Sequence, residues 1–414
     1  MRRCILFFAV VGSLSASAQI SIEEYREEVI TRSLMLKDAR IESEQAELES
    51  MVEYTHFLPK LSASGKFTTD FRRSAGADLW GFNLEPKIEQ TIYAGGKLRS
   101  AYRQSLAHYG MALDEEEQAL LDVRFAADDA YWAVSAMGLY VAATDEYIKI
   151  IRSLYDVVRQ RYQEGYVAHG DVLQVEARLS DAEYSYIAIK NSYDQALHRF
   201  NNLRREVDTL SVELTSSIVD DLTMPQRVGL EEILHRRPDI RAAERGIDIA
   251  EYGVDITRAS FNPSLSAGVS GSWQTYSPNH SAKTYLDGAL VVGLSVPIFH
   301  WGERRSAVAV AKCGVELQHN HLEELHEDIS REEADGWNAL VSSYSQMQSS
   351  LRNVDIASRN LSISTYSYQE GKATLLDVLQ AQISWIQIYT NAITARYNYA
   401  VAWSAYNRIT AMDM

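Results

Sequence analysis

The stretch "YQEGYVAHGDVLQ" at residues 162–174 occurs a second time as "YQEGKATLLDVLQ" at residues 368–380. The two stretches lie 206 residues apart, and the same offset places Gly96 on Gly302 in a second matching pair, "GGKLRSA" and "WGERRSA". Such long-range similarity indicates a duplicated architecture, in which one structural unit has been written twice. The duplication therefore decides how the rest of the chain is interpreted.

The chain begins with features of an export signal. Arg2 and Arg3 precede a short apolar run, which ends at the A-x-A pattern Ala16-Ser17-Ala18. This pattern predicts a signal peptide over residues 1–18. We then expect a first structural repeat over residues 19–224 and a second over residues 225–414, each with a helix, two strands and long helices.

The stretch "TIYAGGKLRSA" at residues 91–101 resembles a phosphate-binding loop only at first sight. A Walker loop requires Ser or Thr after its lysine, whereas Leu98 follows Lys97. In the second copy the lysine is replaced by Glu303. A joint that turns a strand into a helix survives this exchange, so we expect Gly96 and Gly302 to be strand-to-helix joints.

Two very long helices are predicted. All seven prolines lie at or before Pro297, and none lies between Pro86 and Pro225. Apolar residues recur every seven positions from Leu106 to Tyr155, which is typical of a coiled coil. A helix over residues 98–163 would be roughly 100 Å long at 1.5 Å per residue. The span 303–369 should match it.

Alternating runs precede each long helix. Apolar and polar residues alternate from Leu61 and from Phe82 in the first copy, and from Leu265 and Leu286 in the second. Ile92 continues the apolar set of the second run. Strands of ~9–11 residues with one apolar face suit an outer-membrane barrel, although a soluble sheet with one wet face has the same period. Because four strands are too few to close a water-filled barrel, the membrane interpretation requires several chains.

The composition excludes several classes of function. The formal net charge of −16 disfavours nucleic acid as a partner. The histidines of "HNHLEELHE" at residues 319–327 do not share one helix face, so we expect no metal site there. No catalytic or cofactor motif occurs, and we expect neither an enzyme nor a cofactor. Tyr54, Tyr93, Tyr276 and Tyr285 lie near strand ends, where an interfacial belt is possible.

The two "YQEG-x5-DVLQ" segments, the two strand-to-helix joints and the run Arg237-Pro238-Asp239-Ile240 together resemble the TolC-like outer-membrane efflux proteins. The resemblance covers the whole mature chain. It implies a mixed α+β membrane protein, in which a homotrimer forms a twelve-stranded barrel with four strands per chain, continued by a coiled-coil periplasmic tunnel. The implied partners are a periplasmic adaptor, an inner-membrane transporter of the RND, ABC or MFS class, and outer-membrane lipid.

The resemblance also implies a pore constriction at the two matched turns. Asp377 falls on one acidic position of the family, whereas Gln380 occupies the second. Tyr368 and Asp171 match a closing network, but the arginine of that network is replaced, and Lys372 stands beside its place. Whether Lys372 takes over this role stays open. We expect a ring of three Asp377 carboxylates that attracts cations.

The turn glycines Gly165 and Gly371 are predicted helix-terminating residues around which an adaptor docks. Asp171 and Asp377 have a purely structural alternative, because a carboxylate six residues after each glycine can cap the returning helix. We favour capping for Asp171 and a pore role for Asp377. Among functions, the leading hypothesis is a passive exit duct for efflux or type I secretion. The alternative is a periplasmic coiled-coil adaptor or structural protein without a barrel.

Overall fold

A computed structural model describes the chain over residues 19–69, 80–206, 212–218, 223–274 and 285–412. The predicted signal peptide and Tyr276 lie outside these residues. The chain divides into two units. The bundle unit contains residues 1–35, 120–233 and 331–414, and the sheet unit contains residues 36–119 and 234–330. The two longest helices contribute one part to each unit, so each unit is described by itself.

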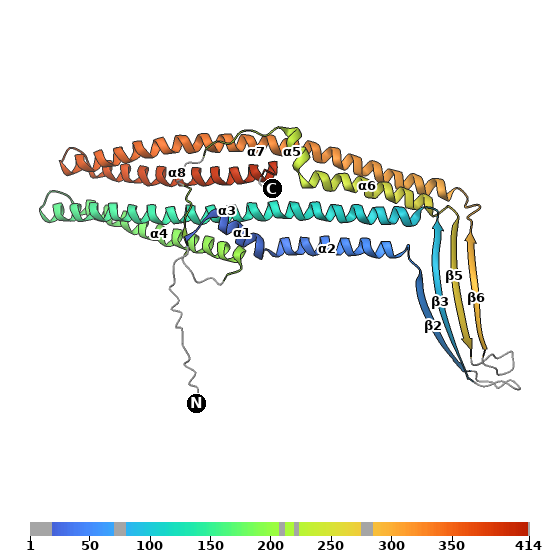
Figure 1. Cartoon of the computed structure of the whole chain (residues 1–414). Helices are drawn as coiled ribbons and strands as arrows, with labels where there is room; N and C mark the ends of the chain where they lie inside the picture. The colour runs from blue at the N-terminus through green and yellow to red at the C-terminus, as the bar shows by residue number, and fades with distance from the viewer. Residues whose placement is uncertain (1–18, 70–79, 207–211, 219–222, 275–284, 413–414) are drawn as a thin grey trace, which may run out of the picture. The chain divides into compact units, whose positions relative to one another are not determined.

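The bundle unit consists mainly of two helical hairpins (Figure 1). Its elements are β1 (Gln19–Ile20), α1 (Ile22–Arg32), the later part of α3 (Lys97–Gln163), α4 (His169–Arg204), β4 (Glu213–Leu214), the later part of α7 (Glu303–Gln369) and α8 (Leu375–Thr410). The short helix α5 (Leu230–Arg236) begins at the end of this unit's second segment. β1 and β4 pair in parallel. The expected helices over 98–163 and 303–369 are confirmed almost to the residue.

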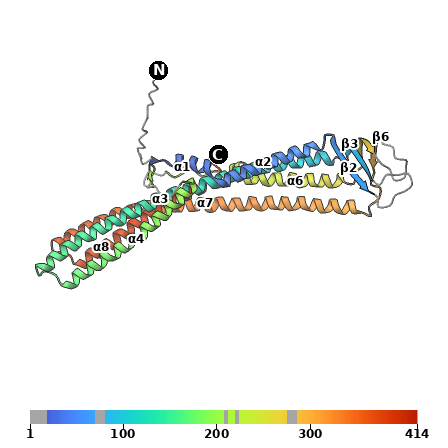
Figure 2. The same ribbon diagram turned by 90° about the horizontal axis from the view of Figure 1, so that it is seen from below.

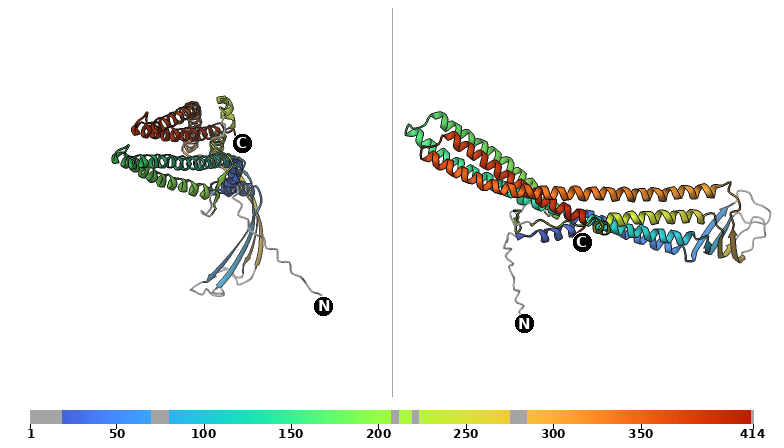
Figure 3. Two further views of the ribbon diagram at one scale, coloured as in Figure 1. Left: turned by 90° about the vertical axis from the view of Figure 1, so that its left-hand side faces the viewer. Right: turned by 90° about the horizontal axis from the view of Figure 1, so that it is seen from above.

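Four helices share one apolar core in the bundle unit (Figure 3). Ile151 and Val158 of α3 are fully buried, together with Val175 of α4 and Val378 of α8. Tyr368 of α7 is part of the same cluster. A second cluster surrounds Leu340 and Tyr399. The apolar stripes of the hairpins therefore stabilise them by burial against one another.

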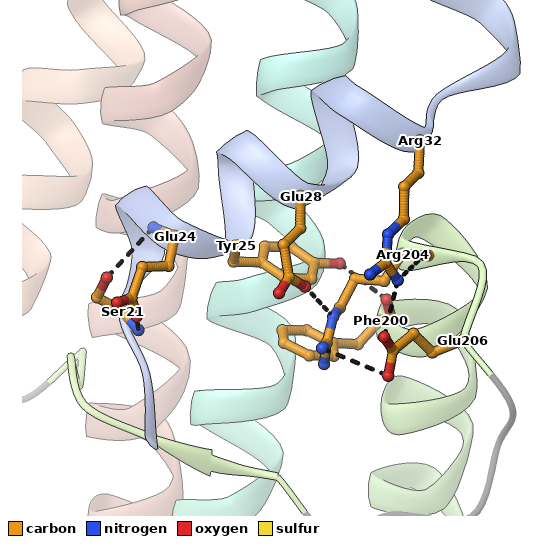
Figure 4. A network of polar contacts seen from close by, with 8 residues as sticks. All are labelled: Ser21, Glu24, Tyr25, Glu28, Arg32, Phe200, Arg204 and Glu206. Carbon is orange, nitrogen blue, oxygen red and sulfur yellow. Dashed lines mark hydrogen bonds and ion pairs between the residues drawn. The ribbon is translucent and has the colours of Figure 1, made fainter. Parts of the chain in front are cut away.

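A polar network ties α1 to the end of α4 (Figure 4). Ser21 and Glu24 form a capping box that begins α1. The ring of Tyr25 stacks on Phe200, with 3.9 Å between the centroids, and its hydroxyl donates to the Phe200 carbonyl at 3.0 Å. Burial raises the pKa of the Tyr25 phenol, so this hydroxyl stays protonated. Arg204 completes the network.

The Arg204 guanidinium lies almost fully buried and pairs with Glu28, with 2.6 Å between Nε and Oε2. Glu206 also contacts Arg204 and accepts from Arg32 at 2.8 Å. The pair holds the pKa of the Glu206 carboxyl below its ordinary value, mainly through the Arg32 hydrogen bond. This junction fixes the place where α4 ends.

The sheet unit joins helices to four antiparallel strands (Figure 2). Its elements are most of α2 (Leu34–Thr55), β2 (Lys60–Thr69), β3 (Trp80–Ala94), the first part of α3, α6 (Pro238–Ala259), β5 (Ser264–Gln274), β6 (Tyr285–Ser295) and the first part of α7. The strand order is β2-β3-β5-β6. Within the described residues, no helix combines the length and apolarity needed to cross a membrane.

The register of the sheet gathers the apolar residues on one face. Leu84 lies opposite Trp273, and Ile88 opposite Val269. The same face continues from Val269 to Leu290 on β6 and from Ile88 to Leu61 on β2. The expected alternation is thus confirmed across all four strands, because residues directly opposite one another share a face.

A β-bulge corrects one detail of the predicted pattern. The register of β3 shifts between Thr91 and Tyr93, and Tyr93 lies opposite Leu265. The strict alternation expected around Ile92 is therefore interrupted, and Tyr93 joins the apolar face opposite Leu265. A bulge inserts one unpaired residue and reverses the sides of those that follow.

The heptad pattern of α3 also holds over only part of its length. Ala127, Val134 and Ile148 are buried as expected in the bundle unit. In the sheet unit, Leu106 and Leu113 are about 40 % exposed in the single chain, and Asp114 is buried instead. Its carboxylate accepts from two arginines of α6, from Arg241 Nε at 2.8 Å and from Arg245 Nε at 2.6 Å. Paired charge, rather than the heptad, decides which face of α3 meets α6.

Candidate functional site

The two matched turns of the bundle unit have nearly the same backbone. Gly165 and Gly371 adopt positive φ values of 83° and 72°, which an L side chain rarely adopts. In the second turn, the Gly371 amide donates to the Tyr368 carbonyl and the Lys372 amide to the Ser367 carbonyl. These two bonds satisfy carbonyls that the end of a helix leaves free. The predicted role of both glycines in ending the helices agrees with this geometry.

Arg161 connects the two hairpins at these turns. It lies near the end of α3, and its guanidinium donates to the Tyr368 carbonyl at 3.1 Å and to the Gln369 carbonyl at 2.6 Å. The same guanidinium lies 4.7 Å from the centre of the Tyr368 ring. One side chain of the first hairpin thus holds the last turn of α7 through two charge-assisted hydrogen bonds and a cation–π contact.

Tyr368 is the most enclosed of the predicted gate residues. It is buried, and its hydroxyl has no hydrogen-bond partner within the described residues. Burial raises the pKa of the Tyr368 phenol, the Arg161 charge opposes this rise, and the nearby Asp171 carboxylate adds to it. Arg161, Tyr368 and Asp171 therefore form one electrostatic cluster at the turns.

Asp377 has a structural task of its own. It is the third residue of α8, where it forms a capping box with Thr374. The Thr374 amide donates to the Asp377 carboxylate at 2.8 Å, and the Thr374 hydroxyl does so at 2.7 Å. These hydrogen bonds hold the pKa of the exposed Asp377 carboxyl below its ordinary value. The carboxylate is therefore charged at neutral pH and open to solvent.

Asp171 does not cap its helix as we expected. Ala168 is the N-cap of α4, and no side-chain hydrogen bond completes the cap. Asp171 instead lies half-buried beside Tyr368. Lys372 and Gln380 are exposed, and Lys372 forms no ion pair within the described residues. The structure thus brings together Tyr368 and Asp171, and leaves Lys372 outside their cluster.

Arg161 is not among the site residues expected from the sequence. A signal was present, because the 206-residue offset places Ser367 where Arg161 stands in the first copy. A charged residue in only one of two matched turns indicates a role that the duplication itself does not require. In the second copy, Ala373 occupies the place of the family network's arginine, with Lys372 beside it.

A groove of about 640 Å³ lies beside this contact in the bundle unit. It is lined by α3 and α7, with Gln382 reaching it from α8. Gln382 is 1 % exposed, and its Oε1 atom has no hydrogen-bond partner within the described residues. Hydroxyl side chains including Ser153, Ser358 and Ser362 line the same groove. The groove thus combines hydroxyl and amide groups with apolar side chains such as Ile150 and Val157.

The strand-to-helix joints of the sheet unit adopt left-handed backbone in both copies. Gly96 and Gly302 have φ values of 96° and 83°, and each follows another residue of positive φ. These are Gly95 in the first copy and Trp301 in the second, at 64° and 49°. Among the described residues, no group of three or more His, Cys, Asp or Glu side chains could hold a metal ion.

Comparison with known proteins gives three consistent findings. Residues 26–203 and 229–411 match the family described as outer membrane efflux protein. The alkaline protease secretion protein AprF of Pseudomonas aeruginosa is 25% identical over 81% of this chain and 70% of its own length. The outer membrane protein TolC of Escherichia coli is 23% identical over 83% and 72%. A crystal structure of CusC superposes with a TM-score of 0.83 at 16% identity, over 96% of this chain and 95% of that one.

Proposed function

This chain belongs to the outer membrane efflux protein family, and we propose that its duct is held closed at the helical end by Arg161. The protein is an outer-membrane exit duct with helices that extend into the periplasm, and it is a passive channel rather than an enzyme. The fold confirms the expected class, since the four-stranded sheet and the long helices are one chain's share of the barrel and tunnel. An adaptor without a barrel has no use for this sheet.

The duct is a homotrimer in this proposal. In the single chain, β2 and β6 form the two edges of the sheet. An exposed edge presents unpaired backbone groups, which a bilayer does not tolerate. Pairing of β6 with β2 of a neighbouring copy removes every edge, and three copies of four strands make up the twelve-stranded barrel that the family resemblance implies.

The contact between Arg161 and Tyr368 carries the gating proposal. It joins the first hairpin to the second at the end where both helices turn back. Opening requires the second hairpin to move away from the first, so the two hydrogen bonds and the cation–π contact must break. Together these interactions are worth about 2 kcal/mol, which shifts a closed-to-open ratio roughly thirtyfold.

A periplasmic adaptor docks around Gly165 and Gly371 and into the adjacent groove. The unpartnered Gln382 and Tyr368 polar atoms support this role, because a buried polar atom without a partner is costly in the isolated chain. A docked polar helix face can supply the missing hydrogen bonds. The adaptor then links the duct to an inner-membrane transporter of the RND, ABC or MFS class.

Planar-bilayer recordings test the gating proposal. Arg161→Ala should raise the open probability of the reconstituted trimer, because the last turn of α7 loses its partner on α3. Arg152→Ala is the matched control: it removes an exposed arginine of the same helix, whose partner Glu183 also lies in the first hairpin. An Arg161→Ala channel that opens no more often than the control would show that the contact does not hold the duct closed.

A further inference from the structure

The region where the sheet meets its helices has the opposite charge balance from the rest of the protein. Within the sheet unit it consists of residues 53–60, 87–103, 255–264 and 296–305. These residues include eight lysines and arginines but four aspartates and glutamates, whereas the whole chain has 40 and 56. Basic residues are therefore concentrated at this joint in an otherwise acidic protein.

The four acidic residues of the joint already have local partners. Their contacts are Glu53 with His56 at 3.1 Å, Glu89 with Lys87 at 2.7 Å, Asp255 with Arg258 at 3.0 Å and Glu303 with His300 at 3.3 Å. Each partner belongs to the same short segment as its acid. Glu89 and Asp255 therefore neutralise Lys87 and Arg258, whereas Glu53 and Glu303 contact nearby histidines.

Six basic side chains of the joint remain without such a partner. Lys60 lies opposite Glu89 on the polar face of the sheet, so we call the other five the basic collar: Lys97, Arg99, Arg103, Arg304 and Arg305. All five are exposed, and none forms an ion pair within the described residues. Lys97 and Arg99 follow one strand-to-helix joint, and Arg304 and Arg305 follow the other. Both copies thus place positive charge at the beginning of the helix that follows the strand-to-helix joint.

Exposed aromatic rings accompany the basic collar. Trp301 is 90 % exposed and Phe299 is 68 % exposed, and their ring centroids lie 4.9 Å apart. Trp301 keeps this position although its φ of 49° is unfavourable for a non-glycine residue. Tyr93 is half-exposed and lies at the end of β3, just before the first strand-to-helix joint. Tryptophan and tyrosine at such positions are typical of a membrane–water interface.

The collar lies where the apolar face of the sheet ends. Tyr93 is opposite Leu265, and Leu265 is opposite Leu294, close to the last residue of β6. The apolar face of the sheet therefore extends to the strand-to-helix joints, and the collar residues follow these joints along the chain. Since the helices extend into the periplasm, this end of the sheet meets the periplasmic leaflet of the outer membrane.

We propose that the basic collar binds the phosphate groups of anionic phospholipids in the periplasmic leaflet. The guanidinium fork of arginine matches phosphate oxygens in a bidentate manner, and lysine adds a compact charge. Basic residues next to an apolar membrane surface are attracted to an anionic leaflet, and this attraction stabilises the protein in the membrane. The protein as a whole is acidic, with a net charge of −16, so the collar is where this attraction acts. The collar thus selects the lipids that surround the barrel at its periplasmic rim.

Fluorescence quenching in nanodiscs tests the proposal on the full-length trimer. The probes are brominated phosphatidylglycerol and brominated phosphatidylcholine, each added at the same fraction to phosphatidylcholine discs. The Trp301 signal is the difference between the wild type and Trp301→Phe. At low salt, we expect brominated phosphatidylglycerol to quench the Trp301 fluorescence about threefold more strongly than brominated phosphatidylcholine does. At about 1 M salt, where charges are screened, the two lipids should quench equally.

The collar variant Lys97→Gln/Arg99→Gln/Arg304→Gln/Arg305→Gln should remove the preference at low salt. A matched control removes four exposed basic residues of the bundle unit, by Arg152→Gln, Arg159→Gln, Lys190→Gln and Arg352→Gln, and should retain it. Equal quenching by both lipids in the wild type overturns the proposal. An absence of quenching by either lipid also overturns it, because the collar would then bind another partner. A preference for phosphatidylglycerol that persists at high salt overturns it as well. The salt titration keeps the test valid if the collar variant does not assemble.

Discussion

The two strand-to-helix joints follow the same backbone path with opposite surroundings. At the first joint, a Cβ atom on Gly95 would lie 2.5 Å from Cβ of Asn262 and 2.6 Å from the carbonyl oxygen of Ala259. The Asn262 side chain also donates to the Gly95 carbonyl at 3.0 Å. At the second joint, the equivalent Trp301 is almost fully exposed. One copy uses the left-handed residue for close packing, and the other uses it to present a large side chain.

The two helical turns differ in the same way. Gly165 and Gly371 share a backbone conformation, but Thr374 and Asp377 cap the second returning helix, whereas Ala168 leaves the first uncapped. A duplicated backbone thus preserves its glycines while each copy acquires separate side-chain tasks. Exchanging residues between the copies tests this distinction directly.

The largest effect is expected at the first joint. Gly95→Ala should destabilise the protein by about 3 kcal/mol, because the new Cβ overlaps two fixed groups and the backbone disfavours it. Gly96→Ala is the control, since no atom lies within 4 Å of its Cβ position and only the backbone cost of about 1–2 kcal/mol applies. Thermal denaturation of the purified protein measures both. Equal losses would mean that crowding at Gly95 is unimportant.

A smaller effect is expected where the copies differ in a buried charge. Glu333 lies 206 residues after Ala127, is 4 % exposed, and accepts from Arg227 at 2.7 Å and 2.9 Å. Glu333→Ala, which introduces the residue of the first copy, should lower the free energy of unfolding by about 2 kcal/mol, because the pair with Arg227 is lost. The loss stays this small because the Arg227 guanidinium can be hydrated instead. The exposed Glu327→Ala is the control.

The pH dependence of this loss follows from the direction of the pKa shift. Arg227 holds the pKa of the Glu333 carboxyl below its ordinary value of 4.5. The pair therefore stabilises the fold fully above that pH, and its contribution is lost as the pH falls through the lower, folded pKa. Melting temperatures of the wild type and Glu333→Ala should converge on acidification. A gap that stays constant down to strongly acidic pH would contradict this assignment.

Exchanging the N-caps should change local stability by about 1 kcal/mol. Thr374→Ala removes the capping box of α8, and Ala168→Thr offers α4 the hydroxyl that it lacks. Hydrogen exchange of the first-turn amides should become faster in the first variant and slower in the second. The comparison between the turns fails if Ala168→Thr accelerates exchange, since the backbone of the first turn would then be unsuited to a cap.

The smallest effect concerns ion selectivity. In planar bilayers, Asp377→Asn should lower the preference of the channel for cations, because three exposed carboxylates would be neutralised. Asp171→Asn should change it less, since Asp171 is half-buried beside Tyr368. Asp355→Asn on the exposed side of α7 controls for net charge. Equal selectivity of the Asp377 variant and this control would remove Asp377 from the pore.

Long periodic elements could be predicted from the sequence, whereas local exceptions could not. The span 303–369 matches α7 in full, because it is the proline-free duplicate of a span with a sustained heptad pattern. The bulge at Ile92, which places Tyr93 opposite Leu265, leaves no trace in an alternating pattern. Burial of Asp114 depends on Arg241 and Arg245, which lie more than 120 residues away.

The candidate site shows the same limit. Gly165 and Gly371 could be predicted, because chain reversal restricts the residue type. Arg161 was missed, since its partners on α7 are backbone carbonyls, and a carbonyl belongs to every residue type. The predicted boundary between the repeats at residues 224 and 225 and the pore role of Asp377 stay predictions.

The equal lengths of α3 and α7 have an evolutionary consequence. Both helices contain 67 residues. Loss of one codon within either helix would rotate all later side chains by about 100° and shorten that helix by about 1.5 Å relative to the other. Since three copies must align their turns in one plane, such a deletion would be tolerated only with a compensating deletion in the other helix. Among related genes, a deletion or insertion in the segment that encodes α3 should therefore occur together with one of equal length in the segment that encodes α7.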